Sequence, residues 1–161
     1  MQNSDNPKVS LLVPICNVER YLRECLDSAV AQTLKDIEII CINDGSTDSS
    51  PDIIREYMER DPRVKMIDKA NSGYGDSMNC GLEMARGEYV GILESDDFMF
   101  EDSLKKLVAK ADAEHADVVK GDFYLYWSTP SERRELFGII DEHMTGAAYR
   151  PVDRPGIFYR K

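Results

Sequence analysis

The sequence has few residues of the kinds that form zinc sites or disulfide frameworks. It contains two histidines and four cysteines among 161 residues, and no two cysteines form a C-x-x-C pair. A zinc site built from paired cysteines is therefore not expected. We interpret Cys25 and Cys41, which lie in a helical and a strand pattern, as small buried hydrophobes. Unpaired cysteines fit a reducing compartment, so we expect a cytoplasmic protein.

Long apolar runs and excess positive charge are also absent. No segment approaches the ~20 apolar residues of a membrane span, and the first residues, MQNSDNPK, carry no pattern of a secretory signal. Lys and Arg number 20 against 30 Asp and Glu, a net charge of −10. A surface of that sign repels nucleic acid, so we expect no nucleic-acid partner. A phosphate-bearing ligand would need a local cation, such as a divalent metal, to reverse the sign.

Two common phosphate-binding motifs are missing as well. The sequence has no Walker A motif, and Met78 stands where the third glycine of a G-x-G-x-x-G motif would fall in NSGYGDSMN (71–79). A nucleotidyltransferase-like enzyme should carry its glycine-rich motif after the first strand, but VPICNVER (13–20) contains no glycine. These absences disfavour both a dinucleotide-binding domain and a nucleotidyltransferase.

What is present is an alternation of short apolar runs and amphipathic segments. The apolar runs predict strands at 8–13, 36–42, 63–68 and 88–93. The segments that follow them predict helices within 17–34, 51–60, 72–87 and 101–116. Asn17 is expected to cap the first helix and Asp48 the second, and Met78, Leu82 and Ala85 to face inward from the third. A last strand is expected within 117–126.

This alternation predicts an α/β fold, a doubly wound and mostly parallel sheet flanked by helices. We expect a tail at 1–7, a core at 8–120 and a further region at 121–161, where the periodicity fades into loops, a short helix or a hairpin. Ligands bind at the carboxyl ends of the strands in such sheets. Polar clusters follow three of the strands, so they should share one edge: PICN (14–17), NDGSTD (43–48) and ESDD (94–97).

The cluster ESDD gathers three carboxylates within four residues. Two unit charges ~4 Å apart repel by roughly 4 kcal/mol at an effective dielectric near 20, and a hard divalent cation would offset that cost. The alternative is that Asp96 or Asp97 caps the following helix. In NDGSTD, Asp44 is a candidate acceptor for a ring N–H of a base, with the Gly45 and Ser46 backbone leaving space for it. The alternative there is an ordinary turn.

Taken together, the segments 9–50 and 71–98 resemble the family 2 glycosyltransferases of the Rossmann-like GT-A fold. The resemblance covers about residues 8–120. It implies a nucleotide-diphospho-sugar donor, usually UDP-linked, bound with Mn²⁺ or Mg²⁺. It also implies inverting transfer of the sugar to a hydroxyl of a sugar or lipid-linked acceptor. The expected role is in surface polysaccharide synthesis, at the inner face of the membrane.

The resemblance also assigns site residues. Asp96 is the expected metal ligand, and Asp44 the residue that contacts the base. Glu94 faces the ribose, or the metal through water. The other expected nucleotide-binding residues are Pro14, Asn17, Gly45, Ser46, Asn79 and Ser95.

Several positions depart from the family pattern. Cys16 replaces an aromatic residue, Glu94 replaces the first aspartate of Asp-x-Asp, and Met78 replaces an arginine, with Lys69 and Arg86 as candidate substitutes. The catalytic base is expected beyond this chain, and we interpret Asp141 and Glu142 as a surface loop pair. A nucleotide-sugar-binding module without catalysis therefore stays an alternative. The segment 149–161 is interpreted either as a peripheral membrane contact or as an unpaired edge, and the oligomeric state is not predicted.

Overall fold

The computed structural model describes residues 6–128 and 131–137. The chain divides into two compact units, Met1–Lys106 and Leu107–Lys161, which are described separately. Asp141, Glu142 and the segment 149–161 lie outside the described residues. The division of the chain at 120 stays a prediction.

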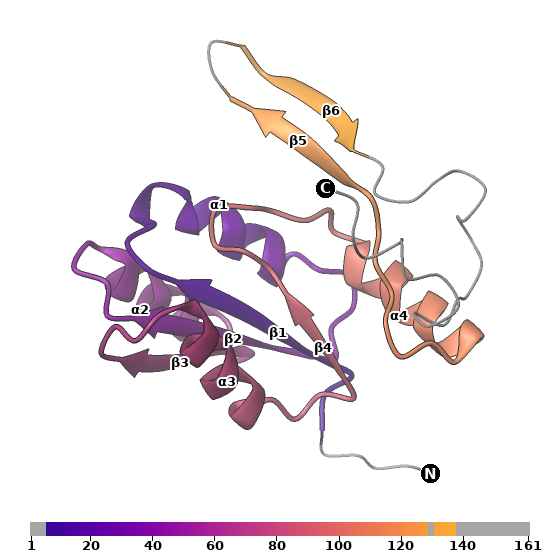
Figure 1. Cartoon of the computed structure of the whole chain (residues 1–161), viewed down its shortest axis with the longest axis horizontal. Coiled ribbons are helices and arrows are strands. Elements are labelled where there is room, and N and C mark those ends of the chain that lie inside the picture. The colour runs from indigo at the N-terminus through magenta and orange to yellow at the C-terminus, as the bar shows by residue number, and fades with distance from the viewer. Residues whose placement is uncertain (1–5, 129–130, 138–161) are drawn as a thin grey trace. The chain divides into compact units, whose positions relative to one another are not determined.

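The first unit contains a four-stranded parallel sheet. The strands lie in the order β3-β2-β1-β4 (Figure 1). Their bounds are Val9–Ile15 for β1, Ile37–Asp44 for β2, Val64–Lys69 for β3 and Tyr89–Ile92 for β4. Every residue of β1 and β2 is buried, as their nearly continuous apolar sequences require of inner parallel strands. The predicted doubly wound, parallel arrangement is confirmed.

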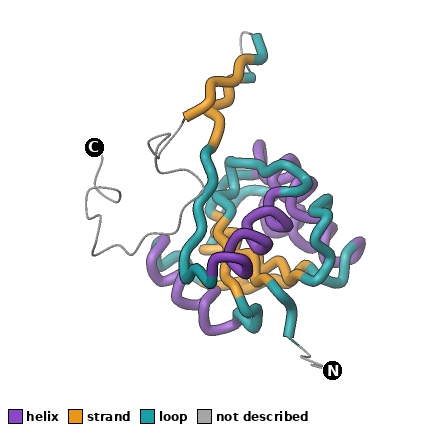
Figure 2. Tube along the Cα trace, turned by 90° about the vertical axis from the view of Figure 1, so that its right-hand side faces the viewer, coloured by secondary structure: helices purple, strands orange, loops and turns teal. Residues whose placement is uncertain are grey.

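Three helices connect the successive strands of the first unit and cover its sheet, whose strands lie between helices in Figure 2, and a fourth helix follows β4 and crosses the boundary between the two units. Their bounds are Glu19–Val30 for α1, Ser50–Arg60 for α2, Tyr74–Met84 for α3 and Ser103–Glu114 for α4. α1 contacts α2, whereas α3 contacts β1 and β2 and lies on the opposite side of the sheet from α1 in Figure 1. Cys25 and Cys41 are fully buried as expected, and burial raises the pKa of Cys41 to about 12.

α3 packs on the sheet through a narrow face. Met78 is buried against Leu12, Ile40 and Ile42, and a Cβ on Gly81 would lie 3.1 Å from the Leu12 side chain. The prediction that Leu82 faces inward is wrong, because its side chain is 51% exposed. The buried face is centred near Gly81, and at about 100° per residue the next position turns away from the sheet.

The ladder between β1 and β4 ends before β1 does. β1 pairs with β2 along its whole length but with β4 only from Val9 to Leu12. The N–H of Leu93 donates to the carbonyl of Leu12 (2.9 Å), so the backbone of Leu12, and of Pro14 two residues on, faces the β4 side. Proline has no N–H to continue the ladder. The end of pairing coincides with the switch point of the sheet, because β2 and β3 lie on one side of β1 and β4 on the other.

The second unit contains an antiparallel hairpin. β5, Phe123–Trp127, pairs with β6, Arg133–Phe137, and the rings of Phe123 and Phe137 stack with centroids 5.1 Å apart. The strand expected within 117–126 therefore starts later and pairs with β6. No helix within 6–128 and 131–137 is both long and apolar enough to cross a bilayer.

Candidate functional site

The loops after β1 and β2 are joined at the carboxyl edge of the sheet. The N–H of Asn17 donates to Ser46 Oγ (3.0 Å), and the N–H of Thr47 donates to Asn17 Oδ1 (2.8 Å). Asn17 has a φ of +55°, in the left-handed region that asparagine tolerates better than most residues. Two predicted nucleotide-binding residues thus contact each other directly. The prediction that Asn17 caps α1 is wrong, because the N-cap is Val18 and Asn17 is instead committed to the neighbouring loop.

Asp48 and Glu19 connect the beginnings of α1 and α2. Asp48 Oδ1 accepts from the N–H of Ser50 (2.9 Å) and Oδ2 from the N–H of Glu19 (3.0 Å), while Glu19 Oε2 accepts from the N–H of Ser49 (2.8 Å). These bonds satisfy amide groups that a helix leaves unpaired at its first turn. The prediction that Asp48 caps α2 is wrong, because the N-cap is Ser49. Asp48 instead accepts from the first residue of each of the two helices.

Asp44, at the end of β2, holds the loop that leads into α3. It is 5% exposed; Oδ1 accepts from the N–H of Ser72 (2.9 Å), Oδ2 accepts from the N–H of Gly73 (2.9 Å), and Lys69 forms an ion pair with it. The Lys69 ammonium, followed by the two amides, lowers the pKa of Asp44. A carboxylate has about four acceptor sites, so Asp44 has little capacity left for a further donor.

Gly45 allows this loop to approach. Its φ is +66°, and a Cβ there would lie 2.6 Å from the backbone nitrogen of Asn71. The side chain of Asn71 then donates to the carbonyl of Asp44 (2.9 Å) and lies 3.3 Å from Cys16 Sγ. The glycine is therefore required by a close backbone contact as well as by the turn.

The acidic cluster follows β4 beside the end of the β1 ladder. Glu94 and Asp96 are exposed, Ser95 is 6% exposed, and the N–H of Asp97 donates to the carbonyl of Glu94 (3.0 Å). Partial desolvation, then the charges of Asp96 and Glu94, raise the pKa of Asp97. The helix-cap alternative is wrong, because α4 begins only at Ser103.

A tyrosine that the sequence did not single out contacts this cluster. The hydroxyl of Tyr74, the first residue of α3, donates to Glu94 Oε1 (2.7 Å). That bond and burial raise the pKa of Tyr74. No three Asp, Glu, His or Cys side chains in the described part of the chain converge closely enough to hold a metal ion by themselves.

Lys69 and Arg86, the two candidate substitutes for the arginine that Met78 replaces, lie at opposite edges of the sheet. Lys69 lies at the carboxyl edge, where it pairs with Asp44 and, at 3.1 Å, with Asp76. Arg86 lies at the amino edge, where its backbone N–H donates to Glu38 (2.8 Å). Met78, which stands at the arginine position, is buried in the core. Only Lys69 is thus near the predicted site, and it is already paired with carboxylates.

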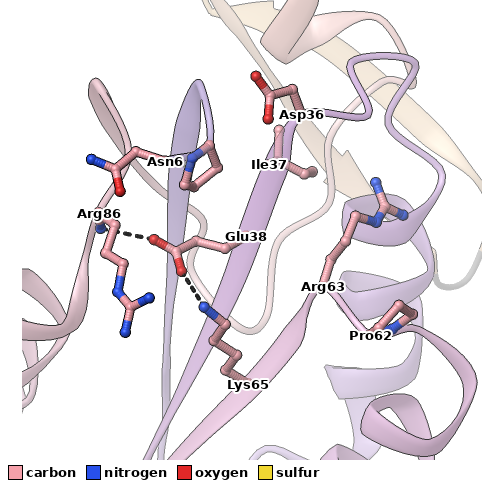
Figure 3. A pocket seen from close by; sticks show the side chains of 9 residues that line it. Asn6, Asp36, Ile37, Glu38, Pro62, Arg63, Lys65 and Arg86 are labelled. Atoms are coloured by element: carbon pink, nitrogen blue, oxygen red, sulfur yellow. Dashed lines mark hydrogen bonds and ion pairs between the residues drawn. The ribbon is translucent and has the colours of Figure 1, made fainter. Parts of the chain in front are cut away.

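The pocket at the amino edge has a volume of about 310 Å³ and is lined by residues that include Glu38, Arg63, Lys65 and Arg86 (Figure 3). Glu38 is 3% exposed and accepts from Ser10 Oγ (2.5 Å), Lys65 Nζ (2.6 Å) and the N–H of Arg86. Burial opposes ionisation, but the bonds from Lys65 and Ser10 lower the pKa of Glu38. This network ties the turn between α3 and β4 to the sheet, so we assign it a structural role.

The remaining predicted residues flank the carboxyl edge without joining its hydrogen bonds. Pro14 is a buried residue of β1. Asn79 is exposed on α3, and its side chain has no hydrogen-bond partner among residues 6–128 and 131–137. The edge thus combines three polar loops, an acidic cluster and the end of a strand ladder, an arrangement that suits a polar ligand at a sheet switch point.

Comparison with known proteins identifies the family. Residues 10–154 match the family model of glycosyl transferase family 2. Glycosyltransferase GlyA of Streptococcus pneumoniae is 39% identical over 153 residues, which make up 94% of this chain and 21% of that protein. Two solved structures share the fold, and both are longer proteins.

The first is S. aureus TarS 1-349 in complex with UDP-GlcNAc, with a TM-score of 0.65, 33% identity, and coverage of 68% of this chain and 32% of that chain. The second is the mannosyltransferase PcManGT from Pyrobaculum calidifontis in complex with GDP-Man and Mn²⁺, with a TM-score of 0.58, 27% identity, and coverage of 64% and 32%. The central sheet has the GT-A arrangement of such structures. The chain spans 21% of GlyA and 32% of each of these structures. This chain belongs to glycosyl transferase family 2.

Proposed function

We propose that this chain forms the donor-binding part of an inverting glycosyltransferase. The donor is a nucleotide-diphospho-sugar, UDP-linked, and the acceptor is a hydroxyl of a sugar or of a lipid-linked glycan. The observation that carries the proposal lies at the carboxyl edge, next to the end of the β1–β4 ladder. There the loops after β1 and β2 are bonded to each other, and the loop after β4 is bonded to the start of α3. The UDP-GlcNAc complex of TarS supports a uridine donor.

Each predicted residue has a place in this proposal. The nucleotide lies along the loops after β1 and β2 and contacts Pro14, Asn17, Gly45, Ser46 and Asn79. Asp44 keeps the loop before α3 in position and offers its remaining acceptor capacity to a ring N–H of the base. Glu94 and Ser95 lie on the ribose side.

We propose Asp96 as the ligand of a Mn²⁺ or Mg²⁺ ion. Carboxylate oxygens suit these hard cations, which are often held by one or two carboxylates together with substrate phosphates, so a site that lacks three converging protein ligands still fits an ion that arrives with the donor. Glu94, Asp96 and Asp97 already place three carboxylates within four residues, and a diphosphate alone would add to that negative charge. When bound, the ion neutralises the diphosphate and stabilises it as a leaving group. The Mn²⁺ in the PcManGT complex supports this choice.

The proposal assigns no catalytic base among the described residues. Inverting transfer needs a carboxylate to accept the proton of the acceptor hydroxyl, and loss of a general base costs roughly 10²–10⁴ in rate. A module that binds nucleotide sugars without transferring them is therefore the second candidate, favoured by Glu94 and Met78 in place of the family's aspartate and arginine. Release of free sugar or glycosylated product from the donor by this chain would support the first candidate over the second.

Substitution of Asp96 tests the metal assignment. Asp96→Asn should abolish Mn²⁺-linked UDP binding in calorimetry and leave the far-UV circular dichroism spectrum unchanged. Asp102→Asn is the matched control, because Asp102 forms an exposed ion pair with Lys106 (2.6 Å). Equal UDP affinity in Asp96→Asn and the parent chain would rule out Asp96 as the ligand.

A lipid-linked acceptor would place the active protein at the cytoplasmic face of a membrane. Co-sedimentation with vesicles that contain a polyprenyl-phosphate-linked sugar, compared with vesicles that lack it, tests this part of the proposal. Equal sedimentation with both would speak against contact through the acceptor.

A further inference from the structure

We infer that Tyr74 is a positioning residue that orients Glu94 toward a ribose hydroxyl of the donor. The inference rests on the proposed function. Its starting point is the 2.7 Å hydrogen bond from the Tyr74 hydroxyl to Glu94 Oε1. Tyr74 begins α3 and Glu94 follows β4, so this bond joins two segments 20 residues apart in the chain at the carboxyl edge.

The bond leaves one carboxylate oxygen for a ligand. Glu94 is exposed, and its Oε2 has no hydrogen-bond partner in the part of the chain that the structure describes. An unrestrained glutamate loses side-chain conformational entropy when it is fixed by a ligand. A glutamate already held through Oε1 loses less, and such pre-organisation strengthens binding. Oε2 can then accept a hydrogen bond from a hydroxyl group without a further change of rotamer.

Tyr74 is itself held in place from β2. The N–H of the preceding Gly73 donates to Asp44 Oδ2, and Gly73 has a φ of +93°. A Cβ at Gly73 or at Gly75 would meet no atom within 4 Å, so there is open space on both sides of the tyrosine backbone. A series of contacts thus runs from Asp44 through Gly73 and Tyr74 to Glu94, and it borders unfilled space.

This role also accounts for glutamate at position 94. An aspartate there is shorter by one C–C bond, about 1.5 Å, which would place its carboxylate beyond hydrogen-bond range of the Tyr74 hydroxyl. The longer side chain brings one oxygen to the tyrosine and leaves metal binding to Asp96. Glu94 therefore accepts a hydrogen bond from the ribose of the sugar donor, and Tyr74 sets the direction of the Glu94 carboxylate.

Calorimetric titration of the 161-residue chain with UDP, 2′-deoxy-UDP and 3′-deoxy-UDP, all with Mn²⁺, tests the inference. The parent chain should prefer UDP over at least one deoxy analogue. Tyr74→Phe keeps the ring and removes the hydroxyl, so the ligand must order Glu94 itself. UDP binding should therefore weaken about tenfold, and the preference for UDP should fall. Glu94→Asp should do the same, and the double variant should bind no more weakly than Glu94→Asp alone.

Tyr21→Phe is the matched control, because Tyr21 is exposed on α1 and should leave UDP affinity unchanged. The urea midpoint of Tyr74→Phe should equal that of the parent chain. Three results would each overturn the inference. Tyr74→Phe could bind UDP with the affinity of the parent chain, the double variant could show additive losses of affinity, or the loss of affinity could accompany a lower urea midpoint. A change in Mn²⁺ dependence with an unaltered deoxy preference would also overturn it. No UDP binding by the parent chain would instead contradict the proposed function.

Discussion

Asp44→Asn is expected to destabilise the fold more than any surface substitution, because Asp44 anchors the loop before α3. The asparagine keeps one acceptor oxygen, but its amide group opposes one of the two backbone N–H donors, Ser72 or Gly73. It also removes the charge that pairs with Lys69, whose side chain is 15% exposed.

Two contributions set the magnitude. A lost hydrogen bond to a charged group costs about 1.5–3 kcal/mol, and breaking a buried ion pair costs about 3–5 kcal/mol. Lys69 retains Asp76 at 3.1 Å as a second partner, which reduces the ion-pair contribution to well below its usual range. We therefore expect a total loss of about 3 kcal/mol from the two contributions together. For a chain of this size that corresponds to a fall of roughly 6–12 °C in the midpoint of thermal unfolding.

Thermal and urea unfolding followed by far-UV circular dichroism measure this loss. Asp52→Asn is the control, because Asp52 pairs with Arg55 at the surface, where the two side chains are 81% and 55% exposed; its effect should stay within about 0.5 kcal/mol. A loss below about 1 kcal/mol in Asp44→Asn, together with a weakened preference for UDP over GDP, would refute the anchoring role. Asp44 would then act mainly on the base.

Two further predictions concern the buried carboxylates. Glu38→Gln leaves Lys65 without its charged partner and should lower the free energy of unfolding by about 2–3 kcal/mol, with UDP affinity unchanged because Glu38 lies at the amino edge; an unaltered urea midpoint would contradict this. Folding lowers the pKa values of Asp44 and Glu38. The two carboxylates therefore stabilise the fold fully at a pH above their ordinary pKa values near 4, and this stabilisation is lost as the pH falls through their folded-state pKa values. Urea unfolding from pH 7 to 3 should show stability constant to about pH 5 and then falling, less steeply in Glu38→Gln; a loss confined to alkaline pH would contradict it.

The arrangement of the sheet followed from the sequence because burial leaves a strong pattern. β1 and β2 are nearly continuous apolar runs, and parallel inner strands require that composition. The meeting of the polar loops followed too, since the carboxyl ends of parallel strands share an edge. The family assignment depended on several motifs in order rather than on any one of them.

The details of the edge did not follow, because long-range hydrogen bonds leave no local pattern. Asparagine is a common N-cap residue, but the side chain of Asn17 accepts a hydrogen bond from the N–H of Thr47, thirty residues away. Asp44 was predicted as a free acceptor, and only the structure shows the donors at Ser72 and Gly73. The contact of Tyr74 was not predicted for the same reason. The one signal in the sequence is a tyrosine between two glycines in a polar loop, which is unusual.

The central claim is that the carboxyl edge binds a uridine diphosphate donor with a divalent cation. A calorimetric titration of UDP into the chain with Mn²⁺, repeated with EDTA, tests it most directly. The proposed function predicts heat of binding with Mn²⁺ and its loss with EDTA. Equal binding in both conditions would contradict the role of the ion, and no binding in either would contradict the donor site.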